Sequence, residues 1–192
     1  AFLHALWNFI LRGSEDKFLS MTAVVLGHIP FALIGILVFG FPDSNALSYI
    51  LASALLHFFY QIFLLNAYKF GELSEIYPIA RGLSPLIIIS ISFSFFEENV
   101  SFYEVVGILL ISLSLIIYGL KQFLNNETNI KGFSLALITG CFIASYSIVD
   151  GYGARITQNP IGFYSSMTLI NGLIFYLYAK WKDRDIIKRI FI

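Results

Sequence analysis

The sequence has few charged residues, a single cysteine and no net charge. Only 12% of its 192 residues are charged and 58% are hydrophobic, whereas about a quarter of the residues in ordinary soluble domains are charged. A soluble globule of this length could not bury that much apolar surface. The composition therefore excludes a soluble enzyme, a disordered chain and a nucleic-acid-binding protein. The lone Cys141 excludes a disulfide framework and any metal site built from cysteines.

Several sequence motifs of known chemistry are also missing. The chain contains no glycine-rich nucleotide-binding loop with its lysine, no HExxH helix, no GxSxG turn and no dinucleotide-binding fingerprint. No pair of histidines has the spacing and the neighbouring carboxylates of a metal site. The sequence consequently indicates no catalytic residue, no cofactor and no metal.

What the sequence does contain is a series of long apolar runs. A membrane-spanning helix needs about 20 mostly apolar residues to cross a hydrocarbon core about 30 Å thick. Six runs meet or approach this length, at residues 18–41, 46–68, 76–96, 103–123, 132–149 and 161–179. Short polar separators divide them, as expected between antiparallel neighbours. The predicted fold is all-α, a polytopic bundle of transmembrane helices embedded in a lipid bilayer.

Both ends of the chain look incomplete. Residues 1–12 are apolar but too short to span, and they resemble the second half of a helix whose beginning is missing. The other end stops just after a basic stretch of the kind that flanks a span. We expect the protein to continue in both directions.

Basic residues are sorted to one side of the predicted spans. Arg155 alone lies on the opposite side, and Arg81 lies inside a run. The other ten are Arg12, Lys17, Lys69, Lys121, Lys131, Lys180, Lys182, Arg184, Lys188 and Arg189. By the positive-inside rule the side with these ten faces the cytoplasm, which predicts a multi-pass protein of the cytoplasmic (inner) membrane.

A short internal similarity points to a repeated architecture. Shifting the chain by 139 positions pairs residues 1–8 with 140–147, and small residues and an aromatic–polar pair align in both copies. This offset contains five helices, and an odd number of helices turns the second copy upside down. Inverted repeats are typical of secondary transporters, whose substrate site lies between the repeats near the bilayer midplane.

Four runs of sequence resemble the EamA family of the drug/metabolite transporter superfamily. They are HALWN at 4–8, GSEDK at 13–17, LSEIYPIARGLSPL at 73–86 and ASYSIVDG at 144–151. The Tyr-Pro-x-Ala-Arg-Gly-x-x-Pro portion is the most specific. The resemblance implies ten helices in two five-helix repeats, with residues 1–123 as the first repeat, 124–131 as a loop and 132–192 as the start of the second. It also implies that both termini are cytoplasmic, which conflicts with the distribution of basic residues.

The resemblance implies a secondary transporter that works by alternating access. The expected substrates are small metabolites such as amino acids, often exported, with protons as a candidate coupling ion. The sequence indicates no nucleic-acid partner and does not define an oligomeric state. An alternative from another class is a membrane-embedded enzyme acting on lipid or isoprenoid substrates, which would need His, Glu or Asp clustered at one interface.

Arg81 is the clearest candidate for substrate contact, because an ionisable group inside a span is costly and needs a reason. It lies between Pro78 and Pro85, on one helix stripe with Tyr77 and Ser84. Three interpretations remain open at this point. The guanidinium binds an anionic group of a substrate, it pairs with an internal acid (Glu75 or Asp150), or it reaches the membrane interface.

Three further residues complete the predicted substrate-binding set with Arg81, Tyr77 and Ser84. His57 either carries protons or makes a hydrogen bond to another helix. Trp7 either forms a flat wall for a substrate or is a packing or interfacial aromatic residue. Asp150 either faces a cavity and exchanges protons or ends its helix before Gly151.

Small residues every four positions predict close helix packing. Gly132, Ala136, Gly140 and Ala144 form such a ridge along the run at 132–149.

Overall fold

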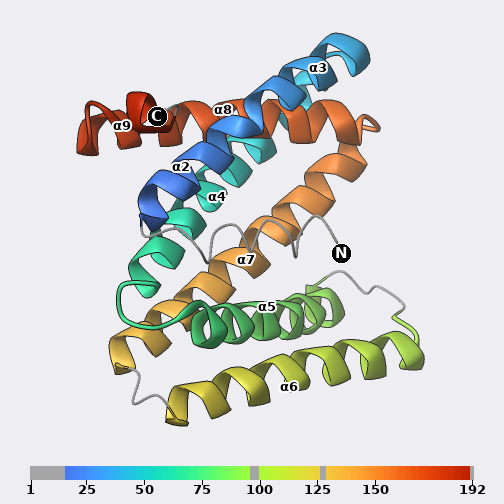
Figure 1. The fold of residues 1–192 in the computed structure, drawn as a ribbon. Coiled ribbons are helices and arrows are strands. Elements are labelled where there is room, and N and C mark those ends of the chain that lie inside the picture. The colour runs from blue at the N-terminus through green and yellow to red at the C-terminus, as the bar shows by residue number, and fades with distance from the viewer. Residues whose placement is uncertain (1–15, 96–99, 126–128, 191–192) are drawn as a thin grey trace. The chain divides into compact units, whose positions relative to one another are not determined.

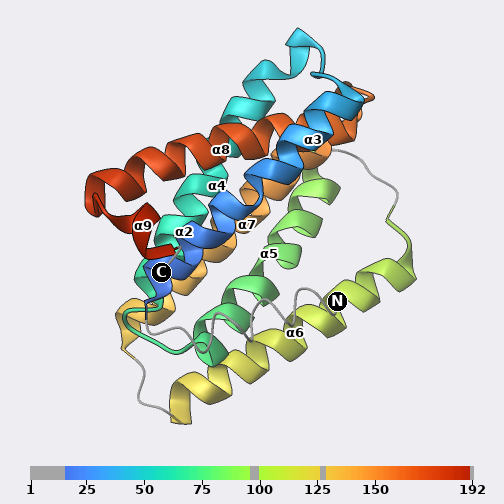
Figure 2. The ribbon, with the colours of Figure 1, turned by 45° about the horizontal axis from the view of Figure 1, so that its top comes forward.

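A computed structural model describes residues 16–95, 100–125 and 129–190 of the chain. All secondary structure within these ranges is helical (Figures 1 and 2). The elements are α2 (Lys17–Gly27), α3 (Ile29–Phe39), the short 3-10 helix η1 (Ser44–Ala46), α4 (Leu47–Ala67), α5 (Leu73–Phe95), α6 (Phe102–Asn125), α7 (Ile130–Ile156), α8 (Pro160–Lys182) and α9 (Ile186–Ile190).

Six segments of the described chain are long and apolar enough to cross a bilayer. They are Lys17–Phe39, Ser44–Ala67, Leu73–Phe93, Phe102–Asn125, Ile130–Ile156 and Pro160–Lys182. Each coincides with one of the six runs expected from the sequence. The chain is thus an all-α protein of multi-pass character, while the inverted repeat, its boundaries and the identity of the membrane stay predictions.

The first span is interrupted, although the sequence suggested one continuous run. α2 ends at Gly27 and α3 begins at Ile29, with His28 between them. Pro30 explains the break, because proline has no backbone N–H and its ring collides with the carbonyl group four residues earlier. Helical hydrogen bonding resumes immediately afterwards, where the Ala32 N–H donates to the His28 carbonyl at 3.0 Å.

The chain forms two compact units. The first, which we call the α8 unit, comprises residues 1–58 and 152–192, and the second, the α5 unit, comprises residues 59–151. The divisions fall inside α4 and α7.

In the α8 unit, helix α8 lies alongside α3 and α2 (Figures 1 and 2). The approach to α3 is close, because a Cβ on Gly35 would collide with the Ser165 hydroxyl oxygen. Phe163 and Phe175 of α8 are fully buried. The Asn171 side-chain amide of α8 donates to the Ala54 carbonyl of α4 at 3.2 Å. A polar group within the span is therefore satisfied between helices, as lipid surroundings require.

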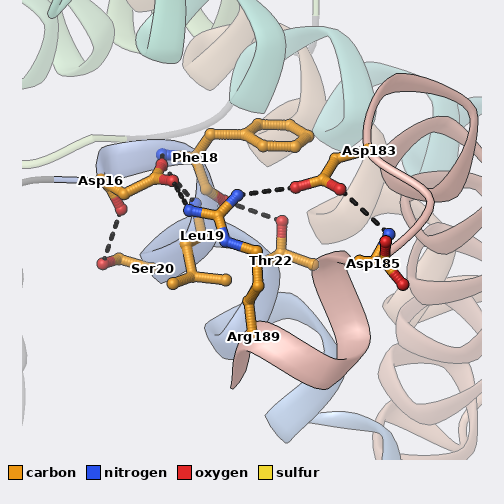
Figure 3. A network of polar contacts seen from close by, with 8 residues as sticks. All are labelled: Asp16, Phe18, Leu19, Ser20, Thr22, Asp183, Asp185 and Arg189. Carbon is orange, nitrogen blue, oxygen red and sulfur yellow. Dashed lines mark hydrogen bonds and ion pairs between the residues drawn. The ribbon is translucent and has the colours of Figure 1, made fainter. Parts of the chain in front are cut away.

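A charged network fastens α9 to the start of α2 (Figure 3). The Asp16 carboxylate caps α2 by accepting the N–H groups of Phe18 and Leu19. Its second oxygen lies 2.6 Å from one terminal nitrogen of Arg189, and the other terminal nitrogen of Arg189 lies 2.6 Å from Asp183. We call Asp16, Asp183 and Arg189 the Arg189 clamp.

The Arg189 clamp makes the attachment of α9 sensitive to acid. Partial burial raises the pKa of Asp16, but the hydrogen bonds from Leu19 and Arg189 outweigh this effect and lower that pKa below its ordinary value of 3.8. The hydrogen bond from Arg189 likewise lowers the pKa of Asp183. Groups with a lowered folded-state pKa contribute stability above their ordinary pKa, and they lose that contribution as the pH falls through the folded pKa.

We therefore expect the Arg189 clamp to hold α9 against α2 at neutral pH, to weaken once the pH falls below 3.8, and to be lost as the pH falls through the lowered pKa values of Asp16 and Asp183. Spin labels at Gly27 and Lys188, in a Cys141→Ser background, should give a narrow distance distribution at neutral pH and a broad one in acid. Arg189→Gln should broaden the distribution already at neutral pH. An unchanged distribution in both cases would show that the clamp does not hold α9.

The α5 unit is held together by glycines at helix crossings. α5 and α6 run side by side (Figures 1 and 2). A Cβ on Gly82 of α5 would lie 2.8 Å from the Ser112 carbonyl oxygen of α6, and one on Gly119 of α6 would lie 2.7 Å from the Ile79 side chain of α5. A Cβ at Gly119 would also lie 3.2 Å from the Glu75 carbonyl oxygen, so at both glycines one helix lies against the backbone of the other.

The small-residue ridge on α7 is confirmed as a packing surface. A Cβ on Gly140 would lie 2.9 Å from the Ala80 carbonyl oxygen of α5, and one on Gly132 would lie 2.9 Å from the Phe70 carbonyl oxygen. Ala136 and Ala144 are buried as well. Dispersion contacts of this kind are the main attraction between helices in lipid, where water provides no hydrophobic drive.

We expect Gly119→Leu to lower the free energy of unfolding in detergent by about 1–3 kcal/mol, since overpacking displaces backbone as well as side chains. Gly107→Leu, on the same helix, is the matched control, because nothing lies within 4 Å of a Cβ at Gly107. Chemical unfolding of the two variants measures the difference. Equal stabilities would contradict the close contact between α5 and α6.

Candidate functional site

The backbone around Arg81 is altered by two prolines within α5, Pro78 and Pro85. In a regular helix the N–H of residue 85 would donate to the carbonyl of residue 81, and proline cannot do so. The Ser84 hydroxyl takes this place, donating to the Arg81 carbonyl at 3.4 Å. Ser84 is buried. Its hydroxyl gives the Arg81 carbonyl a hydrogen bond in place of the one that Pro85 cannot donate.

The Arg81 side chain lies among tyrosines. The central carbon of its guanidinium is 5.4 Å from the centre of the Tyr77 ring, one helical turn earlier, within the range of a cation–π interaction. Tyr146 and Tyr60 also lie near enough to Arg81 to influence its ionisation. We call these four residues the Arg81 cluster.

Three helices of the α5 unit contribute to the Arg81 cluster. Tyr77 and Arg81 come from α5, Tyr60 from the second half of α4 and Tyr146 from α7. The Tyr60 and Tyr146 rings meet edge to face with their centres 5.5 Å apart, a favoured geometry for aromatic pairs. The cluster therefore joins three helices around one fixed positive charge.

One hydrogen-bond donor of Arg81 has no partner. Its Nε is buried and makes no hydrogen bond within the described chain. A donor on a charged group left unsatisfied in a protein interior costs upwards of about 1–3 kcal/mol. Such exceptions are rare in native structures and call for an explanation.

Arg81 has no acidic counter-ion among the described residues. The described residues thus show no ion pair of Arg81 with Glu75 or Asp150, and the internal pairing stays a prediction. Glu75 is buried on the same helix, but its carboxylate accepts the N–H of Glu72 at 3.0 Å and thereby closes the first turn. Asp150 acts electrostatically on Tyr146 instead.

Asp150 lies inside a helix, not at its end. α7 continues through Gly151 and Gly153 to Ile156, so the expectation that Asp150 ends the helix is wrong. Nothing lies within 4 Å of a Cβ at Gly151, and the backbone there keeps its helical course. Asp150 is buried with 5% exposure, one turn after Tyr146. The structure thus leaves cavity contact and proton exchange as the hypothesis for this residue.

His57 and Trp7 are the two remaining residues of the predicted substrate-binding set. His57 belongs to the α8 unit, and its Nδ1 lies 3.0 Å from the Ser53 carbonyl oxygen of the preceding turn. The Ser53 hydroxyl oxygen lies 3.3 Å from the same nitrogen, so the tautomer decides whether Nδ1 donates to the carbonyl or accepts from the hydroxyl. Trp7 lies outside the described residues.

Sequence reasoning brought Tyr77 and Arg81 together correctly but left Tyr60 and Tyr146 out of the site. The available signal was their depth in the spans. Tyrosines of the interfacial belt lie near helix ends, whereas Tyr60 and Tyr146 lie well inside α4 and α7. Hydroxyl-bearing rings at such depth indicate a polar environment, and Arg81 is the charged group near both rings.

The arrangement is suited to binding an anion. It offers a guanidinium with an unused donor, and phenol hydroxyls that can add neutral hydrogen bonds. In the part of the chain that the structure describes, no group of three or more His, Cys, Asp and Glu side chains could hold a metal ion.

Comparisons with family models, with curated proteins and with solved structures find no match for this chain. The resemblance to the EamA family consequently remains a prediction from the sequence motifs.

We expect Arg81→Met to leave the free energy of unfolding unchanged or to raise it by about 1–3 kcal/mol, because it removes a buried charge and an unsatisfied donor. Chemical unfolding in detergent measures this, with Arg155→Met, at an exposed arginine of α7, as the control. A loss of several kcal/mol in the Arg81 variant alone would show that the guanidinium is a structural element.

Proposed function

We propose that the chain is part of a secondary transporter similar to the EamA family. It would move small metabolites, amino acids or similar solutes, out of the cell across the cytoplasmic membrane by alternating access. The substrate would bind at the Arg81 cluster within the α5 unit.

The observation that carries this proposal is the unsatisfied Nε of Arg81, buried in an apolar span with no carboxylate partner in the described chain. Ionisable groups within a membrane are expensive, and they mark substrate and ion pathways. A charge that costs stability and pairs with no internal acid is accounted for by a ligand that pairs with it during transport.

The structure of α5 supports a moving role for this helix. Its two prolines each remove a backbone hydrogen bond, on either side of Arg81. Small changes at these points would alter the direction of the helix and the access to the guanidinium. Proton coupling would use His57 or Asp150, the ionisable candidates besides Arg81 that lie within spans.

We expect the full-length protein in proteoliposomes to release at least one class of preloaded solute faster than empty liposomes do. The load is a mixture of amino acids, amines and organic acids, assayed with and without a proton gradient. Arg81→Gln should lower the rate about tenfold or more, because charge-assisted hydrogen bonds contribute about 1.5–3 kcal/mol.

Arg155→Gln is the control for removing an arginine, and it should transport at the normal rate. If no solute is released faster than from empty liposomes, the transporter assignment is wrong. If transport occurs and Arg81→Gln retains the full rate at equal reconstitution, the assignment stands, but the contact with Arg81 does not.

A further inference from the structure

We propose that the group recognised by the Arg81 cluster is a single carboxylate, so that the substrates are small organic acids and solutes carrying one such group. This inference rests on the proposed function, since it names the substrate class of the same site. It excludes organic cations and phosphate esters as preferred ligands.

The first argument is charge balance. The described part of the site contains one positive charge, on Arg81, and no carboxylate pairs with it. A cation would add a second positive charge to this surplus. A phosphate ester is largely dianionic at neutral pH, so one negative charge would stay uncompensated in a region of low dielectric constant, at a cost of several kcal/mol. With Asp150, the buried acid one turn after Tyr146, in its protonated form, a monoanion leaves no net charge at the site.

The second argument is donor geometry. A guanidinium can present Nε and one terminal nitrogen as a pair of parallel donors, which match the two oxygens of a carboxylate. Nε is the donor of Arg81 that the described chain leaves without a partner. The centre of the Tyr77 ring is 5.4 Å from the guanidinium carbon, and this contact leaves Nε without a hydrogen-bond partner in the described chain. The edge containing Nε is thus available to a ligand once the helices move.

The third argument concerns the surroundings of that edge. Tyr60, Tyr77 and Tyr146 supply hydroxyls that can donate to a carboxylate without adding charge. Their rings, with Tyr60 and Tyr146 packed edge to face, offer apolar area to the body of the solute. A planar aromatic acid fits both features, and it is a suitable probe.

Four probes of one shape and different charge test the inference on the full-length protein in detergent. They are benzoate, its neutral amide benzamide, the cation benzylamine and the dianion phenyl phosphate, with acetate as a smaller carboxylate. Equilibrium binding is measured by calorimetry for the wild type, Arg81→Gln, Arg81→Lys and the control Arg155→Gln. Chemical unfolding establishes that each variant is folded.

We expect benzoate to bind about tenfold or more tightly than benzamide, benzylamine and phenyl phosphate. Arg81→Gln should weaken benzoate binding about tenfold or more and leave benzamide unaffected. Arg81→Lys should be intermediate, because it keeps the charge but loses the paired donors. Arg155→Gln should bind as the wild type does.

Two results would overturn the inference. One is tighter binding of benzylamine or phenyl phosphate than of benzoate. The other is the absence of Arg81-dependent binding for both benzoate and acetate.

The binding experiment and the transport experiment can fail independently of each other. If carboxylates bind through Arg81 but no solute crosses the membrane, the proposed transport function is wrong and the proposed carboxylate site is confirmed. If amines are transported and the Arg81→Gln variant transports them equally well, the proposed transport function is confirmed and the proposed carboxylate site is wrong.

Discussion

In the hydrocarbon of a membrane, backbone N–H and C=O groups have no water to bond, so the chain must satisfy them itself. Every other feature of this protein is built on that constraint. It favours long helices, and hydroxyl side chains within them bond back to their own helix. The hydroxyls of Thr22, Thr139 and Ser147 each donate to the carbonyl four residues earlier at 2.7 Å. At Pro85, where the backbone N–H is missing, the Ser84 hydroxyl donates a hydrogen bond to the Arg81 carbonyl.

Because the helices are satisfied internally, they can approach each other only through their side chains or where side chains are absent. The α5 unit uses the second route, since Gly82, Gly119 and Gly140 each face a neighbouring helix at distances that exclude a Cβ. In the α8 unit Gly35 has the same role, and fully buried aromatic rings such as Phe163 fill the spaces between helices. Close backbone contact fixes the register of one helix against another, and this register decides which polar side chains meet.

Arg81 is the charged member of the three buried side chains, with Ser112 and Ser166, that have a polar atom without a hydrogen-bond partner in the described chain. The Arg81 carbonyl accepts a hydrogen bond from the Ser84 hydroxyl, and its guanidinium makes a cation–π contact with Tyr77. Its Nε nevertheless has no hydrogen-bond partner within the described chain. A purely structural arginine would have a carboxylate beside it, as Arg189 has in Asp16 and Asp183 (Figure 3). The contrast between these two arginines is the physical reason for assigning Arg81 to a ligand and Arg189 to the fold.

Hydropathy alone determined the six spans, because crossing a bilayer requires an apolar length that no packing arrangement can alter. The spacing of Gly132, Ala136, Gly140 and Ala144 determined a packing ridge for a similar reason, since residues four apart share a helix face. The sequence also singled out Arg81 by its rarity in such a span. It could not decide between a substrate, an internal acid and the membrane interface, because the partner of a side chain lies on another helix.

Only the tertiary structure decided that Asp150 is embedded in α7, that Glu75 bonds its own helix end, and that Tyr60 and Tyr146 approach Arg81. The break at His28 likewise depends on how the chain continues after Pro30. Helical periodicity places a residue on a face, but the rotation and register of packed helices, set by the glycine contacts, determine what that face meets.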